Sequence, residues 1–97
     1  MTKKYWNDWQ KRLGETKQIY LCYPKRLLYS DKGERILSYK FNGDTVDLVI
    51  QRKRYVSDNK PPYYHYHVEN EYITLNRVDI ASIEFDKYKT YLPNIAQ

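Results

Sequence analysis

Residues 35–56 read RILSYKFNGDTVDLVIQRKRYV, and this segment has the strongest strand and turn pattern in the chain. The dipeptide Asn42-Gly43 at its centre is typical of two-residue hairpin turns, because both residues tolerate the positive φ that such turns require. Apolar residues then occupy alternate positions, Val46, Leu48 and Ile50, as they do in a half-buried strand. The stretch therefore predicts two antiparallel strands, residues 35–41 and 45–56, joined by a tight turn.

Side chains alternate between the two faces of a strand, so the faces of this hairpin can be assigned. Three apolar residues of the first strand share one face: Leu37, Tyr39 and Phe41. In the second strand the buried parity continues to Arg52 and Arg54. Lys53 and Tyr55 belong to the opposite face.

Shorter strand patterns surround this hairpin. Apolar and aromatic residues predict strand segments at residues 18–23, 27–30, 63–69, 72–75 and 80–85. Turn-forming residues predict connections at residues 31–34, 57–62, 70–71 and 76–79. In the last strand we expect Ile83 and Phe85 to face inward.

The N-terminal segment has helical spacing over residues 4–13. Four apolar or aromatic residues fall on one helical face: Tyr5, Trp6, Trp9 and Leu13. Thr2 is placed to cap the start of this helix and Gly14 to end it. A helix of this length is unstable alone, so its two Trp rings must either pack on the rest of the chain or form an adhesive surface.

These patterns predict one small domain over residues 1–97, in the α+β class and mostly β. A helix within residues 1–14 precedes an antiparallel meander of about five strands over residues 17–86, and residues 87–97 form a C-terminal tail. The strand rhythm resembles that of small SH3-like or Sm-like barrels, and this resemblance implies a curled sheet. A winged-helix-like α+β domain is the alternative.

The composition narrows the class of protein. The chain has 97 residues, of which 41% are hydrophobic, and a net charge of +5. It lacks an apolar run of the roughly 20 residues that a membrane helix needs and a signal-peptide pattern, so we expect a cytoplasmic protein. Cys22 is the single cysteine and is expected to be buried. Residues with A/T-rich codons are frequent, which favours a phage, plasmid or other mobile element as the source.

Basic and aromatic residues are interleaved after residue 51. Cations neutralise phosphates and flat rings stack on bases, so this pattern predicts nucleic-acid binding, to DNA rather than RNA. The main expected contacts are Arg52, Lys53, Arg54, Lys60, Tyr55, Tyr63 and Tyr64. Further phosphate contacts are expected from Lys25, Arg26, Lys11 and Arg12. The alternative interpretation is that these cations only keep exposed strands soluble.

A second functional hypothesis is a protein-binding inhibitor or accessory factor that acts on a host enzyme or defence complex. Trp6 and Trp9 would be its anchors, because Trp and Tyr dominate interface hot spots. Self-association through a sheet edge, giving a homodimer, is a third hypothesis.

The sequence offers few residues for catalysis, so we expect neither an enzyme nor a cofactor. His65 and His67 share a strand face with Glu69, a row that resembles a metal site, but successive positions on a straight strand converge poorly. Four acidic residues could form a metal-dependent nuclease site if they met in a cleft: Asp44, Asp47, Glu84 and Asp86.

Overall fold

The computed structural model describes residues 1–22, 24–61, 63–86 and 90–91. Helix α1 (Lys3–Lys11) and a 3₁₀ turn, η1 (Leu13–Glu15), begin the chain. The strands follow in the order β1 (Thr16–Cys22), β2 (Lys25–Ser30), β3 (Glu34–Asn42), β4 (Thr45–Ser57), β5 (Tyr64–Asn76), β6 (Ile80–Phe85) and β7 (Thr90–Tyr91), with a second 3₁₀ turn, η2 (Arg77–Asp79), before β6. Most of the predicted tail at residues 87–97 lies outside the described residues.

The strands form two antiparallel sheets. One contains four strands in the order β2-β1-β6-β7, and the other contains β3-β4-β5. The prediction of a mostly β, α+β chain with one N-terminal helix is confirmed. The described residues form no closed barrel, because no ladder of hydrogen bonds joins the two sheets. They also include a single α-helix, where a winged-helix arrangement would need a bundle of several.

Helix α1 packs its two indole rings into the core. The Thr2 hydroxyl accepts a hydrogen bond from the Tyr5 amide at 3.0 Å, which confirms the predicted N-terminal cap. The helix ends at Arg12 as its C-cap, and the predicted glycine cap at Gly14 is wrong because Gly14 lies within η1. Trp9 lies edge-on to Tyr39 and Phe41, and its Nε1 donates to Thr16 Oγ1 at 2.8 Å.

The core lies where the two sheets and α1 meet. Its buried side chains come from the N-terminus, α1, β1, β2, β4, β5 and β6: Met1, Trp6, Trp9, Ile19, Leu21, Leu28, Tyr29, Val46, Leu48, Ile50, Leu75, Ile80, Ile83 and Phe85. The prediction that Ile83 and Phe85 face inward is confirmed. Ile80 is also buried, because the register between β1 and β6 shifts at Leu21 and Ala81 is left as an extra residue.

The β3–β4 hairpin has the predicted tight turn, but its two loop residues are Gly43 and Asp44 instead of Asn42 and Gly43. Asn42 pairs with Thr45, and the two-residue loop between them begins at Gly43 with φ of 61°. A β-bulge leaves Leu37 without a partner on β4. The bulge reverses the alternation of faces, so Ile36 packs against the core with Tyr39 and Phe41. The prediction that Leu37 shares their face is wrong, and its side chain is 43% exposed.

Strand β5 is continuous across residues 70–71, where a turn was predicted. Its thirteen residues pair one-to-one with the thirteen residues of β4, from Thr45 with Asn76 to Ser57 with Tyr64, without a shift in register. Asn70 and Glu71 are paired with Gln51 and Ile50 of β4. Backbone pairing with β4 outweighs the local turn tendency of these two residues. Their polar side chains are tolerated in a strand because β5 is exposed here.

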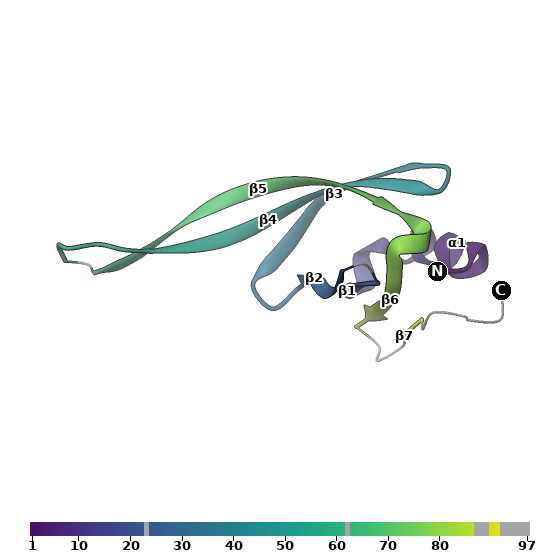
Figure 1. The fold of residues 1–97 in the computed structure, drawn as a ribbon, viewed down its shortest axis with the longest axis horizontal. Coiled ribbons are helices and arrows are strands. Elements are labelled where there is room, and N and C mark those ends of the chain that lie inside the picture. Colours follow the sequence, from purple (N-terminus) through teal and green to yellow (C-terminus); the bar gives the residue numbers. More distant parts are fainter. Residues whose placement is uncertain (23, 62, 87–89, 92–97) are drawn as a thin grey trace.

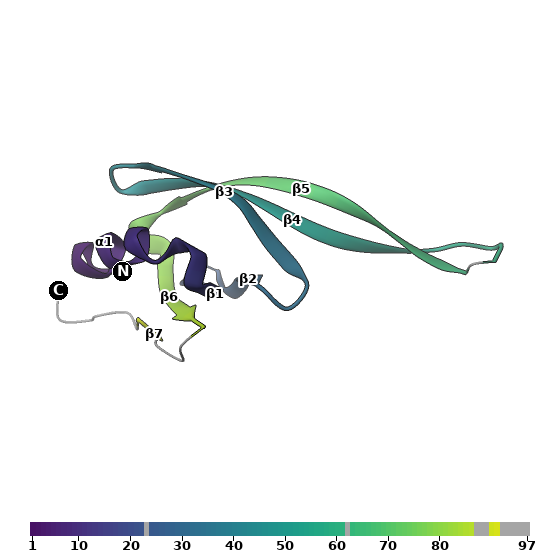
Figure 2. The same cartoon turned by 180° about the vertical axis from the view of Figure 1, so that it is seen from behind.

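The far half of the β4–β5 hairpin projects from the body as a two-stranded arm (Figures 1 and 2). We define the arm as residues 53–68, because β3 pairs with β4 only as far as Arg52. Five extended residues on each strand span about 17 Å, and the whole molecule measures 55 × 25 × 25 Å. Helix α1 lies at the opposite end of the molecule from the tip of the arm.

Candidate nucleic-acid interface

The register of β4 and β5 sorts the side chains of the hairpin onto two different faces. Residues directly opposite in an antiparallel pair share a face. One face, here called the paired face, carries Arg52, Arg54, His65, His67, Glu69 and Glu71. The other face, here called the tyrosine face, carries Lys53, Tyr55, Tyr64, Tyr66, Val68 and Tyr72.

The paired face balances its own charge. Arg52 forms ion pairs with Glu34 and with Glu71, the latter at 2.7 Å, and its Nη2 donates to the Leu28 carbonyl at 3.1 Å. It therefore ties β4 to β2, β3 and β5 at the base of the arm. Arg54 lies 3.4 Å from Glu69. Of the expected phosphate contacts, these two arginines are already engaged by carboxylates.

The His-x-His-x-Glu row lies on this face as the alternation predicts. His67 Nε2 lies 2.8 Å from Glu69 Oε1. This hydrogen bond lowers the pKa of the Glu69 carboxyl, and the nearby charge of Arg54 lowers it further. Within the described ranges, no three His, Cys, Asp or Glu side chains are grouped so that they could hold a metal ion.

On the paired strands of the arm, the tyrosine face combines exposed rings with a cation and no carboxylate, and Asp47 lies further along the same face, where it accepts from Thr74 Oγ1. The exposed fractions of Tyr55, Tyr64 and Tyr72 are 72%, 74% and 77%. The rings of Tyr55 and Tyr66 lie 5.8 Å apart at an angle of 55°, and Lys53 Nζ lies 5.1 Å from the Tyr66 ring centre. Both the rings and the cation are open to a ligand.

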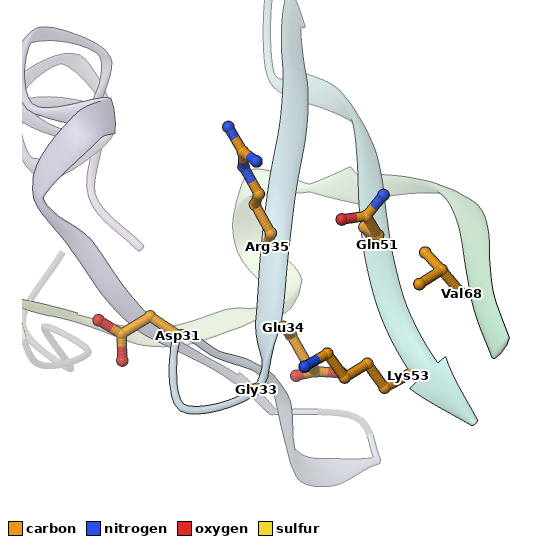
Figure 3. Close-up of a pocket in the computed structure, with 7 residues that line it drawn as sticks. All are labelled: Asp31, Gly33, Glu34, Arg35, Gln51, Lys53 and Val68. Atoms are coloured by element: carbon orange, nitrogen blue, oxygen red, sulfur yellow. The ribbon is translucent and has the colours of Figure 1, made fainter. Parts of the chain in front are cut away.

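A recess of about 240 Å³ lies at the base of the arm, beside Lys53 (Figure 3). The turn between β2 and β3 forms one wall, and Gln51 and Val68 line the side nearer the arm. The lining residues are Asp31, Gly33, Glu34, Arg35, Gln51, Lys53 and Val68. An adjoining hollow adds Lys32 and Tyr55. Because Glu34 is paired with Arg52, the cations Lys32, Arg35 and Lys53 outnumber the remaining acid, Asp31.

The other predicted basic contacts do not join this surface. Lys60 is exposed in the loop at the tip of the arm, where Tyr63 is 59% exposed. Lys25 and Arg26 are exposed at the start of β2, and Lys11 is exposed at the end of α1. Arg12 is half-buried, lies 2.7 Å from Glu15 and covers the Phe85 ring at 4.0 Å. Lys60 thus lies at the tip of the arm, and the other four cations lie on elements of the body.

The two tryptophans expected as interface anchors are buried within the fold. Trp6 is 3% exposed and Trp9 is 0% exposed. Their Nε1 groups donate to Gly43 O and Thr16 Oγ1 within the fold. The amphipathic pattern of α1 predicted a face that needs a partner, and the partner is the aromatic side of β3.

Three of the four acidic residues considered for a nuclease site, all but Asp86, are held in separate structural contacts. Asp44 accepts from Arg77 Nε at 3.1 Å, and Asp47 accepts from Thr74 Oγ1 at 2.6 Å. Glu84 lies in the other sheet, 3.9 Å from Lys17.

Cys22, expected to be buried, is half-buried as a free thiol.

Sequence reasoning missed Tyr66, Val68 and Tyr72 as members of the exposed surface, as well as Lys32 and Arg35 beside the recess. Strand alternation groups Tyr64 with Tyr66 and Val68 on one face, as it groups Lys53 with Tyr55. Their position opposite Lys53 depends on the cross-strand register, which the sequence does not specify.

No protein-family model matches the chain, and neither a curated protein nor a solved structure is significantly similar to it. No helix among the described residues has the length and apolar character needed to cross a membrane.

Proposed function

We propose that the protein binds single-stranded nucleic acid, and DNA in preference to RNA, on the tyrosine face of the β4–β5 arm. The observation that carries this proposal is the separation of charge between the two faces. Every carboxylate of β5 lies on the paired face, opposite or beside an arginine, whereas Lys53 shares its face with four tyrosines. A polyanion therefore meets less repulsion on the tyrosine face than on the other side.

The geometry of this face suits unstacked bases better than a duplex. Exposed rings at successive positions along a strand provide stacking platforms that accept any base. The cations available beside the rings are few: Lys53, with Lys32 and Arg35 around the recess, and Lys40 in the hollow beside Tyr72. Binding that relies on stacking and a small number of phosphate contacts has a modest salt dependence.

Neighbouring residues on opposite faces make matched tests. We expect Tyr66→Ala to weaken binding of a labelled oligo(dT) by roughly 5- to 150-fold, since a stacked base contributes about 1–3 kcal/mol. His67→Ala, one residue away on the paired face, should leave the affinity within about twofold. Lys53→Ala should reduce the log–log salt slope by about 0.7, whereas Arg54→Ala should change it less. Fluorescence anisotropy from low to physiological salt measures all four variants.

Equal losses for Tyr66→Ala and His67→Ala would contradict the proposed surface. Absence of binding to single-stranded DNA, RNA and duplex DNA at low salt would reject nucleic-acid binding altogether.

The extent of the exposed apolar surface favours one other function, a protein-binding inhibitor or accessory factor. Val68 and Tyr72 are exposed on the tyrosine face. Tyr72 and Val49 line a shallow hollow of about 410 Å³ on the same side of the sheet. Aromatic patches of this kind are common at protein interfaces. A partner retained after nuclease treatment of a host lysate, and lost with Tyr72→Ala but not with Lys53→Ala, would favour this function over nucleic-acid binding.

A further inference from the structure

The outer edge of β5 is open along its length. Among the described residues, β5 pairs only with β4, so its other edge presents backbone N–H and C=O groups to no neighbouring strand. Proteins usually protect such edges with Lys, Pro, a bulge or a short strand. Strand β5 has thirteen residues, contains no Lys, Arg or Pro, and pairs with β4 without a bulge.

The edge strands β3 and β2 carry the features that usually protect an edge, namely cations and irregular pairing. The outer strand β3 carries the bulge at Leu37 and the cations Arg35 and Lys40. The outer strand β2 begins with Lys25 and Arg26, and its register with β1 shifts between Ile19 and Tyr20. The three-stranded sheet therefore has one protected edge, at β3, and one edge without a bulge or a cation, at β5.

The acidic residues of β5 do not guard its edge. Glu69 is engaged with Arg54 and His67, and Glu71 with Arg52. Both arginines belong to β4, on the inner side of β5, so these contacts draw the carboxylates away from the open edge. An approaching strand therefore meets unpaired backbone groups at this edge, because the glutamate side chains are bonded to arginines of β4.

We propose that a second copy of this chain pairs with the edge of β5, antiparallel and about a two-fold axis at Val68. Each position then faces the position equally far from Val68 in the second copy. On the paired face, His67 lies opposite Glu69 of the second copy, and His65 lies opposite Glu71. On the tyrosine face, Val68 meets Val68, and Tyr64 meets Tyr72.

Pairing of histidine with a hydrogen-bond acceptor, and avoidance of carboxylates opposite each other, favour this register over its neighbours. An axis at Asn70 would place Glu69 opposite Glu71, and an axis at Glu69 would place that carboxylate opposite itself. Like charges directly opposite each other destabilise a strand pair. An axis at His67 would place that imidazole opposite itself and Glu71 opposite Tyr63. The axis at Val68 gives each histidine an acidic neighbour.

Pairing of this kind would also stabilise the arm. An isolated two-stranded ribbon with both faces in water is marginally stable, and all the arm residues that the structure describes are exposed except Val56. The dimer converts two ribbons into a sheet in the order β4-β5-β5-β4, with both tyrosine faces on one side. The inference is independent of nucleic-acid binding, because it concerns the edge of the strand and not its face.

Disulfide trapping tests the pairing and its register in the full chain without nucleic acid. With Cys22→Ser as the background, Val68→Cys places two thiols across the axis, where antiparallel Cα atoms are about 4.5–5.5 Å apart and a disulfide can form. We expect mild oxidation to trap Val68→Cys as a covalent dimer at least tenfold faster than Asn70→Cys. Faster trapping of Asn70→Cys, or equal rates, would overturn the register and with it the proposal.

Sedimentation equilibrium of the cysteine-free chain measures the dimer without a cross-link. Val68→Lys places two cations on the axis, and we expect it to raise the dimer dissociation constant at least tenfold. Val68→Thr, which keeps the branched shape, should stay within threefold of the parent. Val68 is 49% exposed, so neither change disturbs the core. A parent chain that is monomeric at about 100 μM would overturn the proposal and leave the edge to an extended segment of another protein.

Discussion

Arg52 and Lys53 are adjacent in the sequence, yet the structure gives them different roles. Arg52 lies on the paired face and bonds to Glu34, Glu71 and the Leu28 carbonyl. Lys53 lies on the tyrosine face, above Tyr66. One cation holds the base of the arm to the body, and its neighbour is available to a ligand. A variant that replaced the whole basic cluster would therefore confuse lost stability with lost binding.

The two single variants separate these roles. We expect Arg52→Ala to lower the free energy of unfolding by about 1–3 kcal/mol, because it leaves the Glu34 carboxylate and the Leu28 carbonyl without their donor. Lys53→Ala should change that free energy by less than about 0.5 kcal/mol. Urea unfolding followed by Trp fluorescence measures both. An Arg52→Ala protein as stable as the parent would mean that this cluster does not anchor the arm.

Tyr39 is one of two tyrosines, with Tyr29, whose raised pKa should make the stability fall in alkali. Burial of its hydroxyl raises the pKa of Tyr39 to about 12. An unfolded tyrosine ionises near pH 10, so the native state holds its proton more tightly. This contribution is present below about pH 10 and is lost as the pH rises toward 12.

We expect the free energy of unfolding to fall between about pH 10 and 12, and to fall less steeply in Tyr39→Phe. Urea unfolding at fixed alkaline pH values gives both slopes, and Tyr55→Phe serves as the control because Tyr55 is 72% exposed. Identical pH dependence in Tyr39→Phe and the parent protein would contradict the assignment to Tyr39.

At the scale of elements, the β4–β5 hairpin contains two parts with different physics. From Thr45 to Ile50, β4 buries alternate side chains and pairs with strands on both sides. From residue 53 onward it pairs only with β5, and none of the core side chains comes from the arm. The β4–β5 hairpin is thus part of the core at one end and an exposed two-stranded ribbon at the other.

This division predicts that the arm can be removed without unfolding the body. Arg52 and Glu69 are opposite each other in the register, so an Asn-Gly turn can join them in place of residues 53–68. We expect the shortened protein to keep its near-ultraviolet circular dichroism and to unfold within about 5 °C of the parent, while it loses oligo(dT) binding. Retained binding would place the nucleic-acid site on the body, and loss of the native spectrum would show that the arm contributes to the core.

At the scale of the whole molecule, the two sheets and α1 enclose one core, and the arm extends beyond it (Figure 1). The positive charge that dominates residues 1–40 is spread over the body, with Lys11 and Lys25 on different elements. The cations near the tyrosine rings are Lys53, Lys32 and Arg35, with Lys40 in the hollow beside Tyr72. The net charge of +5 can attract a polyanion over a distance, but the arm supplies the rings that would hold it.

Local patterns in the sequence were enough to predict the capped helix at Thr2, the central turn at Gly43 and the alternation of Val46, Leu48 and Ile50. Each of these depends on residues that are close together in the chain, through hydrogen bonds of a turn or cap and through burial of one face. The parity of Lys53 and Tyr55 follows from the same alternation. These features needed no knowledge of the partner strands.

Tertiary structure alone decided which side chains meet across strands. The bulge at Leu37, the continuation of β5 through Asn70 and the capture of Arg52 by Glu34 and Glu71 all arise from contacts between distant residues. A register is chosen by the sum of many such pairs, so no single stretch of sequence contains it. That choice placed the acids beside the arginines on one face and left the tyrosines with Lys53 on the other.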